Sequence, residues 1–535
     1  MSRFDRLNVL AITAAAALLR LPGIDARGRF DADQGHDMLT LVAFTRDGVV
    51  PLLGPRTSVG DFHHGAFYYF LLAPAAALSN GDPVAVTVFL AILGIAAVAL
   101  TWWLARAIAG PLAGALAGIL LAVSPSAIEQ STFIWNPNPI GFFAVLALAA
   151  AWRARMASVA TLAGGGSHDR GAARRIRGWW ALAIGAAGAV TQLHVLGVVF
   201  LVAVLALCVL EARRDRRVIG GLVGGFAALV LLFAPLLAHE LQTGFLETQR
   251  VLAYIGGDEG TGGGPISALA FTLLRVVGWP LIGLVTDVPA LTAVMLAVTV
   301  GLAVIGLLRA RGDEAAGLRW MLGILAWSTV ALAFAAPSLQ RVVAGLPNDH
   351  YHAFLDPVVV ILVAVPAAGL FTTAVERWRM SRHPAVALAG VAVAAGMVLL
   401  VTVALARKPP HVDPDGGWPA MRDAGTRVVQ HAGPALILLL GLPDFKSADA
   451  VAFPIERAGG TVVDEPTPIA DIGAIVVACD RLFAAAIGAP CGGPAEDALV
   501  QSRFGASGAP QPGLVDRFDA SPRTSISIYT PPSGP

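Results

Sequence analysis

Long apolar runs divide the first 406 residues into segments that are long enough to cross a membrane. About 18 consecutive apolar residues form a helix that spans the hydrocarbon core of a bilayer. Runs of that length lie near residues 84–104, 218–238, 288–308, 319–337, 355–375 and 384–406, and shorter or interrupted runs lie near 7–22, 109–124, 139–152, 179–193 and 195–211. We therefore predict a polytopic α-helical membrane protein with about 11 transmembrane helices.

The placement of arginine predicts how these helices are oriented. Arginine-rich segments precede the first apolar run, at Arg3 and Arg6, and follow the fourth, sixth, eighth and tenth runs. If each of the eleven runs crosses the membrane, an even number of crossings separates these segments, so all of them lie on one side, which is cytoplasmic by the positive-inside rule. No small-residue cleavage pattern follows the first run, so we interpret it as a retained helix. The N-terminus is then cytoplasmic, and the residues after 406 are extracytoplasmic.

One further apolar stretch, residues 266–286, does not fit this count. It is apolar enough to cross the membrane, but an additional crossing would move the segment around Arg309 to the extracytoplasmic side. We therefore interpret residues 266–286 as a helix that lies on, or dips into, the external face of the membrane.

The composition of the chain changes after Lys408, where proline, glycine and aspartate residues form a linker. Apolar runs of strand length follow at 435–440 and 474–478, a polar-apolar segment lies at 525–529, and helical patterns lie at 420–430 and 494–502. Strands that alternate with helices predict a small α/β domain. We accordingly divide the chain into a transmembrane domain, residues 1–406, and an extracytoplasmic α/β domain, residues 407–535.

Two cysteines lie in this second domain. Cys479 ends a predicted strand, and Cys491 opens a turn with two glycines. Because disulfides form in oxidising compartments outside the cytoplasm, we expect these two cysteines to be joined.

Composition narrows the choice of partners. Hydrophobic residues make up 56% of the chain and charged residues 14%, with a mean hydropathy of +0.71, whereas a soluble domain carries about 25% charged residues. The formal net charge of +1 argues against nucleic acid as a partner, because binding to phosphate backbones requires an excess of positive charge. Lysine is nearly absent, and arginine supplies almost all positive charge. The lipid bilayer is the expected partner.

The first external loop, residues 23–82, concentrates carboxylates and imidazoles at one membrane face. Asp31, Asp33 and Asp37 lie within seven residues, with Gln34 among them. A carboxylate in this position can accept a proton as a general base, and Asp31 with Asp33 can share a divalent cation. An ordinary solvated acidic loop is the alternative interpretation.

Later in the same loop, His63 and His64 precede an aromatic stretch that contains Tyr68 and Tyr69. Tyrosine favours the membrane interface, so we expect a helix at the boundary between water and lipid. The two imidazoles can bind a phosphate or a metal, and the alternative is that they are simple interfacial histidines.

Other polar residues gather at the predicted external ends of the apolar runs. They are Trp135, Asn136 and Asn138 in a Trp-Asn-Pro-Asn-Pro turn, Gln192 and His194, Glu240, Arg341, and the cluster of His350, Tyr351 and His352. Polar groups inside apolar sequence cost free energy and are usually retained for a function, although each of these residues could also cap a helix. Eight of the 11 histidines map to this face, which favours a binding site there.

Five motifs in a fixed order resemble the bacterial members of the GT-C glycosyltransferases, the superfamily of the protein O-mannosyltransferases and the lipid A aminoarabinose transferase. The strongest likeness is to the bacterial family 39-like set, over roughly the first 360 residues. The motifs are Asp33-Gln34-Gly35-x-Asp37, Pro-Leu-Leu-Gly-Pro at 51–55, His-Gly-Ala-Phe-Tyr-Tyr at 64–69, Trp-Asn-Pro-Asn-Pro at 135–139, and Gln-Leu-His at 192–194. Gln34 departs from the pattern, because relatives often carry a second acidic residue there.

The resemblance implies transfer of a sugar from a polyprenyl-phosphate donor to an unknown extracytoplasmic acceptor, with inversion at the sugar carbon. Asp33 would be the general base, and His64, His350, His352 and Arg341 are candidates to stabilise the leaving phosphate. No cofactor is required, and a divalent cation at Asp31 and Asp33 is optional. We expect the C-terminal domain to be dispensable for the chemical step and to bind the acceptor or a partner protein.

Three other functions fit parts of the pattern. A transporter would place ionisable residues near the centres of its membrane helices, whereas here they collect at the external ends. An O-antigen ligase or polymerase would carry its large external loop late in the bundle rather than after the first helix. A non-catalytic membrane scaffold would not depend on Asp33.

Overall fold

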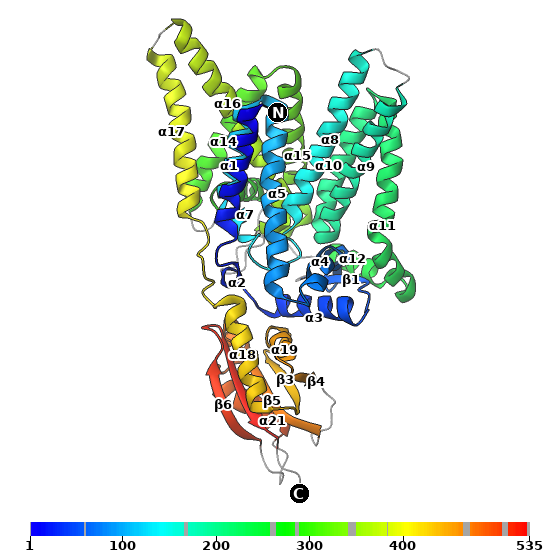
Figure 1. Cartoon of the computed structure of the whole chain (residues 1–535), viewed down its shortest axis with the longest axis vertical. Coiled ribbons are helices and arrows are strands. Elements are labelled where there is room, and N and C mark those ends of the chain that lie inside the picture. The colour runs from blue at the N-terminus through cyan, green and yellow to red at the C-terminus, as the bar shows by residue number, and fades with distance from the viewer. Residues whose placement is uncertain are drawn as a thin grey trace.

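The chain folds into a helical bundle that carries a small sheet domain at one end (Figure 1). This computed structural model describes residues 2–57, 60–164, 169–256, 264–283, 288–340, 349–381, 384–463, 471–504 and 512–531. The N-terminus lies at the end of the bundle that is far from the sheet domain. We call the opposite end, to which the sheet domain is attached, the domain-facing end.

The predicted transmembrane runs are all helical. The bundle contains α1 (Arg3–Arg20), α5 (Pro83–Ala109), α6 (Pro111–Val123), α8 (Ile140–Ala163), α9 (Arg170–Leu193), α10 (Val198–Ala212), α11 (Ile219–Thr243), α13 (Pro265–Ile282), α14 (Pro289–Arg309), α15 (Gly312–Ala335), α16 (Asp356–Ser381) and α17 (Pro384–Ala406). Within the described residues, nine helices are long and apolar enough to cross a membrane. That set includes α13 but not α1, α6 or α9, so the number of crossings stays a prediction.

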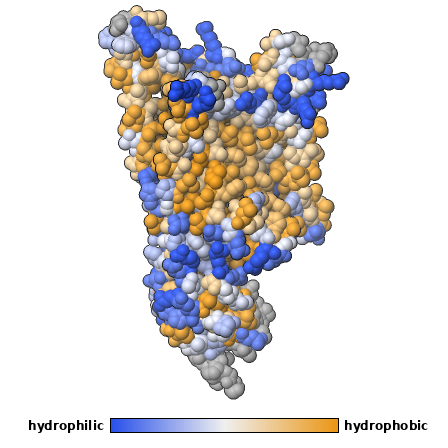
Figure 2. All heavy atoms as spheres, viewed as in Figure 1, coloured by the Kyte–Doolittle hydropathy of each residue, from blue (hydrophilic) through white to orange (hydrophobic). Residues whose placement is uncertain are grey.

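The surface of the bundle is a broad hydrophobic belt between two hydrophilic ends (Figure 2). Large apolar side chains project from it, among them Leu231 on α11, which is 76% exposed, and Leu388 on α17, which is 68% exposed. A soluble monomer rarely exposes so wide an apolar surface, whereas the lipid of a bilayer matches it. The chain is therefore a multi-pass membrane protein.

The second half of α13 contacts the domain-facing end of the bundle. Arg275 pairs with Asp349, with 2.7 Å between Nη2 and Oδ2, and Asp349 opens the 3-10 helix that precedes α16. The carbonyl oxygen of Ile282 accepts a hydrogen bond of 2.5 Å from Nε of Arg407, which directly follows α17. The end of α13 thus lies at the domain-facing end, and α13 is also long and apolar enough to cross a membrane, so its interpretation as an interfacial helix stays a prediction.

Reporter fusions test the predicted orientation. We expect a reporter that is active only outside the cytoplasm to be active when it is fused to the C-terminus. A reporter that is active only in the cytoplasm should be active when it is inserted after Gly164. Arginine-rich segments on one side of the bundle fix this arrangement by the positive-inside rule. Finding both reporters on the same side would contradict the eleven-crossing topology.

Residues 23–82, predicted as an external loop, are folded into short elements at the domain-facing end. Helix α3 (Ala32–Arg46) begins with a capping box: the Asp31 carboxylate accepts the N–H of Asp33, and the Gln34 side chain accepts the N–H of Asp31. This pattern satisfies backbone donors that a helix start leaves open. The other elements of this end are α2 (Ile24–Arg27), β1 (Leu53–Arg56), β2 (His63–Gly65), α4 (Phe67–Leu78), α7 (Pro125–Glu129), α12 (Leu246–Gly256) and the 3-10 helix η5 (Asp349–Leu355).

The C-terminal domain is a five-stranded mixed sheet with flanking helices. Its elements are α18 (Gly417–Ala432), β3 (Leu436–Leu442), α19 (Asp449–Arg457), β4 (Thr461–Val463), β5 (Ile472–Asp480), α21 (Pro494–Phe504), β6 (Gly513–Asp519) and β7 (Thr524–Thr530). The strand order is β4-β3-β5-β7-β6, with β3 parallel to β4 and β5, and β7 antiparallel to β5 and β6. The three predicted strands correspond to β3, β5 and β7, whereas β4, β6 and α19 were not predicted.

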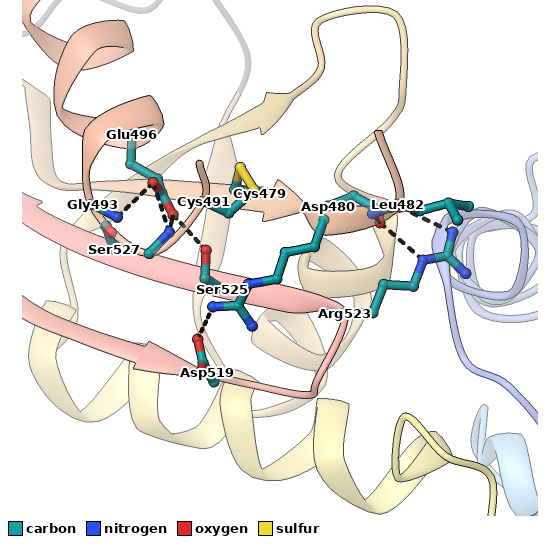
Figure 3. Close-up of a disulfide and its surroundings, with 12 residues drawn as sticks. Cys479, Asp480, Leu482, Cys491, Gly493, Glu496, Asp519, Arg523, Ser525 and Ser527 are labelled. Atoms are coloured by element: carbon teal, nitrogen blue, oxygen red, sulfur yellow. Dashed lines mark hydrogen bonds and ion pairs between the residues drawn. A yellow bond between two sulfur atoms is a disulfide. The ribbon is translucent and has the colours of Figure 1, made fainter. Parts of the chain in front are cut away.

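A disulfide joins Cys479 and Cys491, whose Cα atoms are 5.7 Å apart (Figure 3). It ties the end of β5 to the turn before α21. The carboxylate of Glu496 accepts the N–H groups of Gly492 and Gly493 in that turn. The disulfide thereby holds the segment between Asp480, the last residue of β5, and Cys491 close to the sheet.

The C-terminal domain docks on the start of α3. The ring of Phe30 lies 4.8 Å from the ring of Trp418 on α18 and 6.0 Å from the ring of Phe453 on α19. Nδ1 of His36 lies 2.9 Å from the carboxylate of Asp449 at the start of α19. Aromatic packing and an ion pair together fix the domain next to the acidic segment.

Candidate active site

A cavity of about 480 Å³ lies between the domain-facing end of the bundle and the C-terminal domain. It brings together nine residues that the sequence predicted from separate segments: Asp33, Asp37, His63, His64, Trp135, Asn136, His194, His350 and Tyr351. Each segment ends or begins at this face because the bundle helices cross the membrane and return. The polar residues predicted at one face thus line a common cavity.

A second cavity, of about 200 Å³, adjoins the first. Both cavities are lined by Asp33, Trp135, His350, Tyr351 and Lys446. The second cavity is also lined by charged groups, which are Arg29, Asp31, Glu129 and Arg523. Asp33 therefore lines both cavities at the place where they adjoin.

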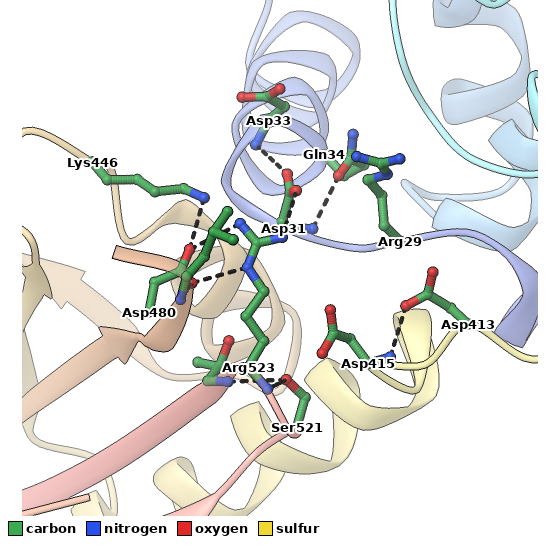
Figure 4. Close-up of polar contacts among 12 residues, drawn as sticks. Arg29, Asp31, Asp33, Gln34, Asp413, Asp415, Lys446, Asp480, Ser521 and Arg523 are labelled. Atoms are coloured by element: carbon green, nitrogen blue, oxygen red, sulfur yellow. Dashed lines mark hydrogen bonds and ion pairs between the residues drawn. The ribbon is translucent and has the colours of Figure 1, made fainter. Parts of the chain in front are cut away.

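The carboxylate of Asp33 is exposed to the cavities, although protein surrounds it on most sides. Asp33 lies in the first turn of α3, where Asp31 holds its N–H (Figure 4). Desolvation by the surrounding protein and the neighbouring charge of Asp31 raise the pKa of Asp33 to about 6, against the opposing effect of Lys446, Arg29 and His36. At neutral pH the group is mostly ionised, yet basic enough to accept a proton.

Asp37, one helical turn later, is buried and held by two phenols. The hydroxyl groups of Tyr68 and Tyr69 each donate a hydrogen bond of 2.9 Å to its carboxylate. Burial raises the pKa of Asp37 to about 7, while the two tyrosine hydrogen bonds act in the opposite direction. The Tyr-Tyr pair thus joins α4 to α3 and fixes the helix face that carries Asp33.

Opposite this helix, the cavity wall is a cluster of imidazole and aromatic rings. The ring of His194 lies 4.9 Å from that of His64, 5.5 Å from that of His350 and 4.6 Å from that of Tyr351. The ring of Trp135 lies 4.3 Å from that of His350. Burial, with a smaller effect of the neighbouring His63, lowers the pKa of His64 to about 3, so this imidazole is neutral at physiological pH.

His63 is positioned by a residue that the sequence did not single out. The carboxylate of Glu247 on α12 accepts the backbone N–H of His63 at 2.7 Å and lies 3.1 Å from Nδ1 of its ring. The ring of Phe62 packs 5.9 Å from that of Tyr254, also on α12. Helix α12 therefore holds the β1–β2 turn against the cavity.

Several predicted site residues are engaged by backbone groups. Amide nitrogens donate hydrogen bonds from Gln34 to the carbonyl of Ile134, from Asn136 to that of Leu193 and from Asn138 to that of Phe133. Gln192 is buried, and its side-chain amide nitrogen and oxygen have no hydrogen-bond partner among the described residues. The amides of Gln34 and Asn136 thus join separate segments of the domain-facing end to one another.

Two further predicted residues, Glu240 and His352, do not line the two cavities. Glu240 accepts hydrogen bonds from the N–H and hydroxyl of Thr248, at the junction of α11 and α12. His352 is fully buried, with Nε2 3.1 Å from the carboxylate of Asp349. Arg341 lies outside the described residues.

The C-terminal domain contributes residues that sequence reasoning missed. Phe445, Lys446 and Ser447, from the loop between β3 and α19, line the larger cavity. This lining brings the domain to the candidate site, although we expect the domain to be dispensable for the chemical step. The rarity of lysine is a sequence signal that could have drawn attention to Lys446, because the chain has only two lysines, Lys408 and Lys446.

An optional divalent cation at Asp31 and Asp33 finds little support from the geometry. In the part of the chain that the structure describes, no group of three His, Cys, Asp or Glu side chains is placed to hold one metal ion. The Asp31 carboxylate accepts the N–H of Asp33 and lies 3.9 Å from Nη1 of Arg523. One oxygen of Asp31 thus accepts a backbone hydrogen bond, and the other faces the cation of Arg523.

Residues 60–218 match the family model of the dolichyl-phosphate-mannose-protein mannosyltransferases. The matched segment contains His63, His64, Trp135 and His194, and it begins after Asp33. No curated protein matches the sequence.

Solved structures match over most of the chain. ArnT from Cupriavidus metallidurans in the apo state is 14% identical, with a TM-score of 0.58 over 97% of each chain. The same protein bound to undecaprenyl phosphate is 13% identical with the same score and coverage. The archaeal oligosaccharyltransferase AglB from Archaeoglobus fulgidus, in complex with an inhibitory peptide and a dolichol-phosphate, is 13% identical, with a TM-score of 0.54 over 90% of this chain and 70% of that chain.

These structures are related to the chain by fold, and their low identities leave the substrate open. The family match and the fold agree with the resemblance that the five motifs carry. The chain therefore has the fold of the GT-C membrane glycosyltransferases.

Proposed function

We propose that the chain transfers a sugar from a polyprenyl-phosphate donor to an extracytoplasmic acceptor, with inversion at the anomeric carbon. The observation that carries the proposal is the Asp33 carboxylate, which has a pKa of about 6 and stands where two cavities meet. The hydrophobic belt of the bundle gives a lipid-linked donor a place for its tail. Among proteins of this fold, ArnT and AglB have been solved with undecaprenyl phosphate and a dolichol-phosphate.

In the proposed reaction Asp33 acts as the general base. An acceptor hydroxyl donates its proton to the Asp33 carboxylate while its oxygen attacks the anomeric carbon. The bond from that carbon to the phosphate oxygen breaks, and the electron pair leaves with the lipid phosphate. Attack from the side opposite to the leaving group inverts the configuration, and Asp33 later returns its proton to solvent.

The departing phosphate needs hydrogen-bond donors, since negative charge develops on its bridging oxygen. Of the four residues predicted for this role, His64 and His350 line the larger cavity, and His352 is buried away from it. Nδ1 of His64 has no hydrogen-bond partner among the described residues. We assign the phosphate contact to His64, as a neutral donor, and to His350.

A panel of radiolabelled polyprenyl-phosphate sugars tests this function. Purified protein in lipid is expected to transfer or hydrolyse the sugar of at least one donor, whereas Asp33→Asn protein should not do so at a comparable rate. Release of polyprenyl phosphate in step with the sugar would support the proposed bond cleavage. If the wild-type protein processes no donor but carries a solute across proteoliposomes, it is a transporter and the proposal is wrong.

A further inference from the structure

The loop between β3 and α19 of the C-terminal domain reaches the place where the two cavities meet. Lys446 lies in this loop and lines both cavities beside Asp33. Its side chain is 21% exposed, so the ammonium group is neither in bulk solvent nor fully buried. In a chain with only two lysines, the other one, Lys408, lies in the linker after α17.

Lys446 is held in place by a series of charged groups with alternating sign (Figure 4). Its Nζ lies 2.9 Å from the carboxylate of Asp480, which directly follows the disulfide-bonded Cys479. Arg523 donates hydrogen bonds of 2.9 and 3.0 Å to the same carboxylate and also faces Asp31, at 3.9 Å. Asp480 thus accepts from two cations, so that the three groups together carry a net positive charge next to α3.

Docking of the domain fixes the distance between this cationic group and α3. The helix that follows the loop, α19, packs against the first turns of α3 so closely that a Cβ atom on Gly35 would lie 2.0 Å from the carbonyl oxygen of Asp449. Arg457, at the other end of α19, donates hydrogen bonds to the carbonyls of Asn80 and Gly81. The loop is therefore anchored to the bundle on the side of Asp33.

We propose, resting on the proposed function, that the C-terminal domain is part of the active site and that Lys446 is the positioning residue that pairs electrostatically with the base Asp33. Lys446 acts on the reaction through Asp33, and the domain delivers it to the junction of the cavities.

The charges around Asp33 explain why such a partner is needed. Asp31 and Asp37 repel a second negative charge on α3, and the surrounding protein removes water from it. Arg29 and His36 oppose these effects from the same segment, and Lys446 opposes them from the C-terminal domain. Tyr351, whose ring is uncharged, and His350 also line both cavities. Without Lys446, Asp33 would be protonated over a wider pH range and could not accept a proton there.

The test compares Lys446→Gln with two matched variants in the full-length protein. Removing the cation should move the rising limb of the pH profile of kcat/KM upward by about one pH unit. The rate would then fall about threefold at pH 6.5 and recover almost fully at pH 8.5. Lys446→Arg, which keeps the charge, should retain the wild-type profile. Lys408→Gln removes the other lysine and should leave the profile unchanged.

A second measurement does not require turnover. The infrared carboxylate band of Asp33, isolated by subtracting the spectrum of the Asp33→Asn protein, is expected to titrate near pH 6 in the wild type and at higher pH in Lys446→Gln. If the wild type processes no donor, the proposed function fails, and this titration still decides the role of Lys446. The inference would be overturned if Lys446→Gln lowered kcat/KM by the same factor at all pH values. It would also be overturned if the Asp33 band titrated at the same pH in Lys446→Gln as in the wild type.

Discussion

Replacing Asp33 with asparagine is expected to lower turnover by about 10²–10⁴-fold, which is the usual contribution of a general base. Asparagine keeps the size and the hydrogen-bonding capacity of the side chain, so donor binding should change little. The pH profile of the wild type should show the same group. Because its pKa is about 6, activity is expected to rise with pH through that value and to fall as Asp33 becomes protonated. Turnover and donor affinity are measured separately, by product formation and by direct binding of the donor.

Asp31→Asn is the matched control, two residues earlier. Asparagine still caps α3, and the contact that is lost, to Arg523 at 3.9 Å, is long. We expect a milder effect than at Asp33. A larger loss at Asp31, or activity that chelators abolish and a divalent ion restores, would support a metal site instead of a base. Wild-type activity in Asp33→Asn would rule out the assignment of the base.

A single methyl group at Gly35 is expected to lower activity by about 100-fold. Gly35 lies within α3, where alanine would normally stabilise the helix by about 1 kcal/mol. Its added Cβ would lie 2.0 Å from the carbonyl oxygen of Asp449 and 2.7 Å from the backbone nitrogen of Ala450. Neither atom belongs to a flexible side chain, so α19 must move. A shift of about 1 Å in a supporting element can cost on the order of 10²-fold in rate.

Gly141→Ala supplies the control for this prediction. Gly141 also lies inside a helix, α8, but nothing lies within 4 Å of its added Cβ. Both variants gain the same helix propensity, and only Gly35→Ala meets the C-terminal domain. We expect Gly141→Ala to keep wild-type activity, and Gly35→Ala to become more sensitive to proteolysis in the linker that follows Lys408. Equal activities of the two variants would show that close docking is unnecessary.

The helices and the apolar strands of this protein can be predicted because burial and lipid exposure leave a direct record in the sequence. The eleven apolar runs all correspond to helices, β3 and β5 correspond to apolar runs, and β7 corresponds to the polar-apolar segment at 525–529. Strand β6, Gly-Leu-Val-Asp-Arg-Phe-Asp, is polar and largely exposed, and β4 has only three residues. The capping box of Asp31 and Gln34 is a sequence signal for the start of α3, which lies in the segment that we predict as an external loop.

The candidate site could be predicted in part, for a different physical reason. Polar residues at the ends of membrane helices must either be solvated or be paired, so their collection at one face indicated a cavity. Whether a given side chain faces the cavity depends on the backbone around it: Asn136 donates to a carbonyl 57 residues away. Lys446 was missed because its position depends on docking between segments about 400 residues apart, which no local pattern records.

Helix α3 presents Asp33 to the cavities and Gly35 and His36 to the C-terminal domain, within a single turn. A substitution that changes how the domain is seated therefore also changes the surroundings of the base. The two parts of the chain are not independent modules. In a chimera, a C-terminal domain borrowed from another protein would have to arrive together with its own first external loop, and in evolution the two segments would have to diverge as a pair.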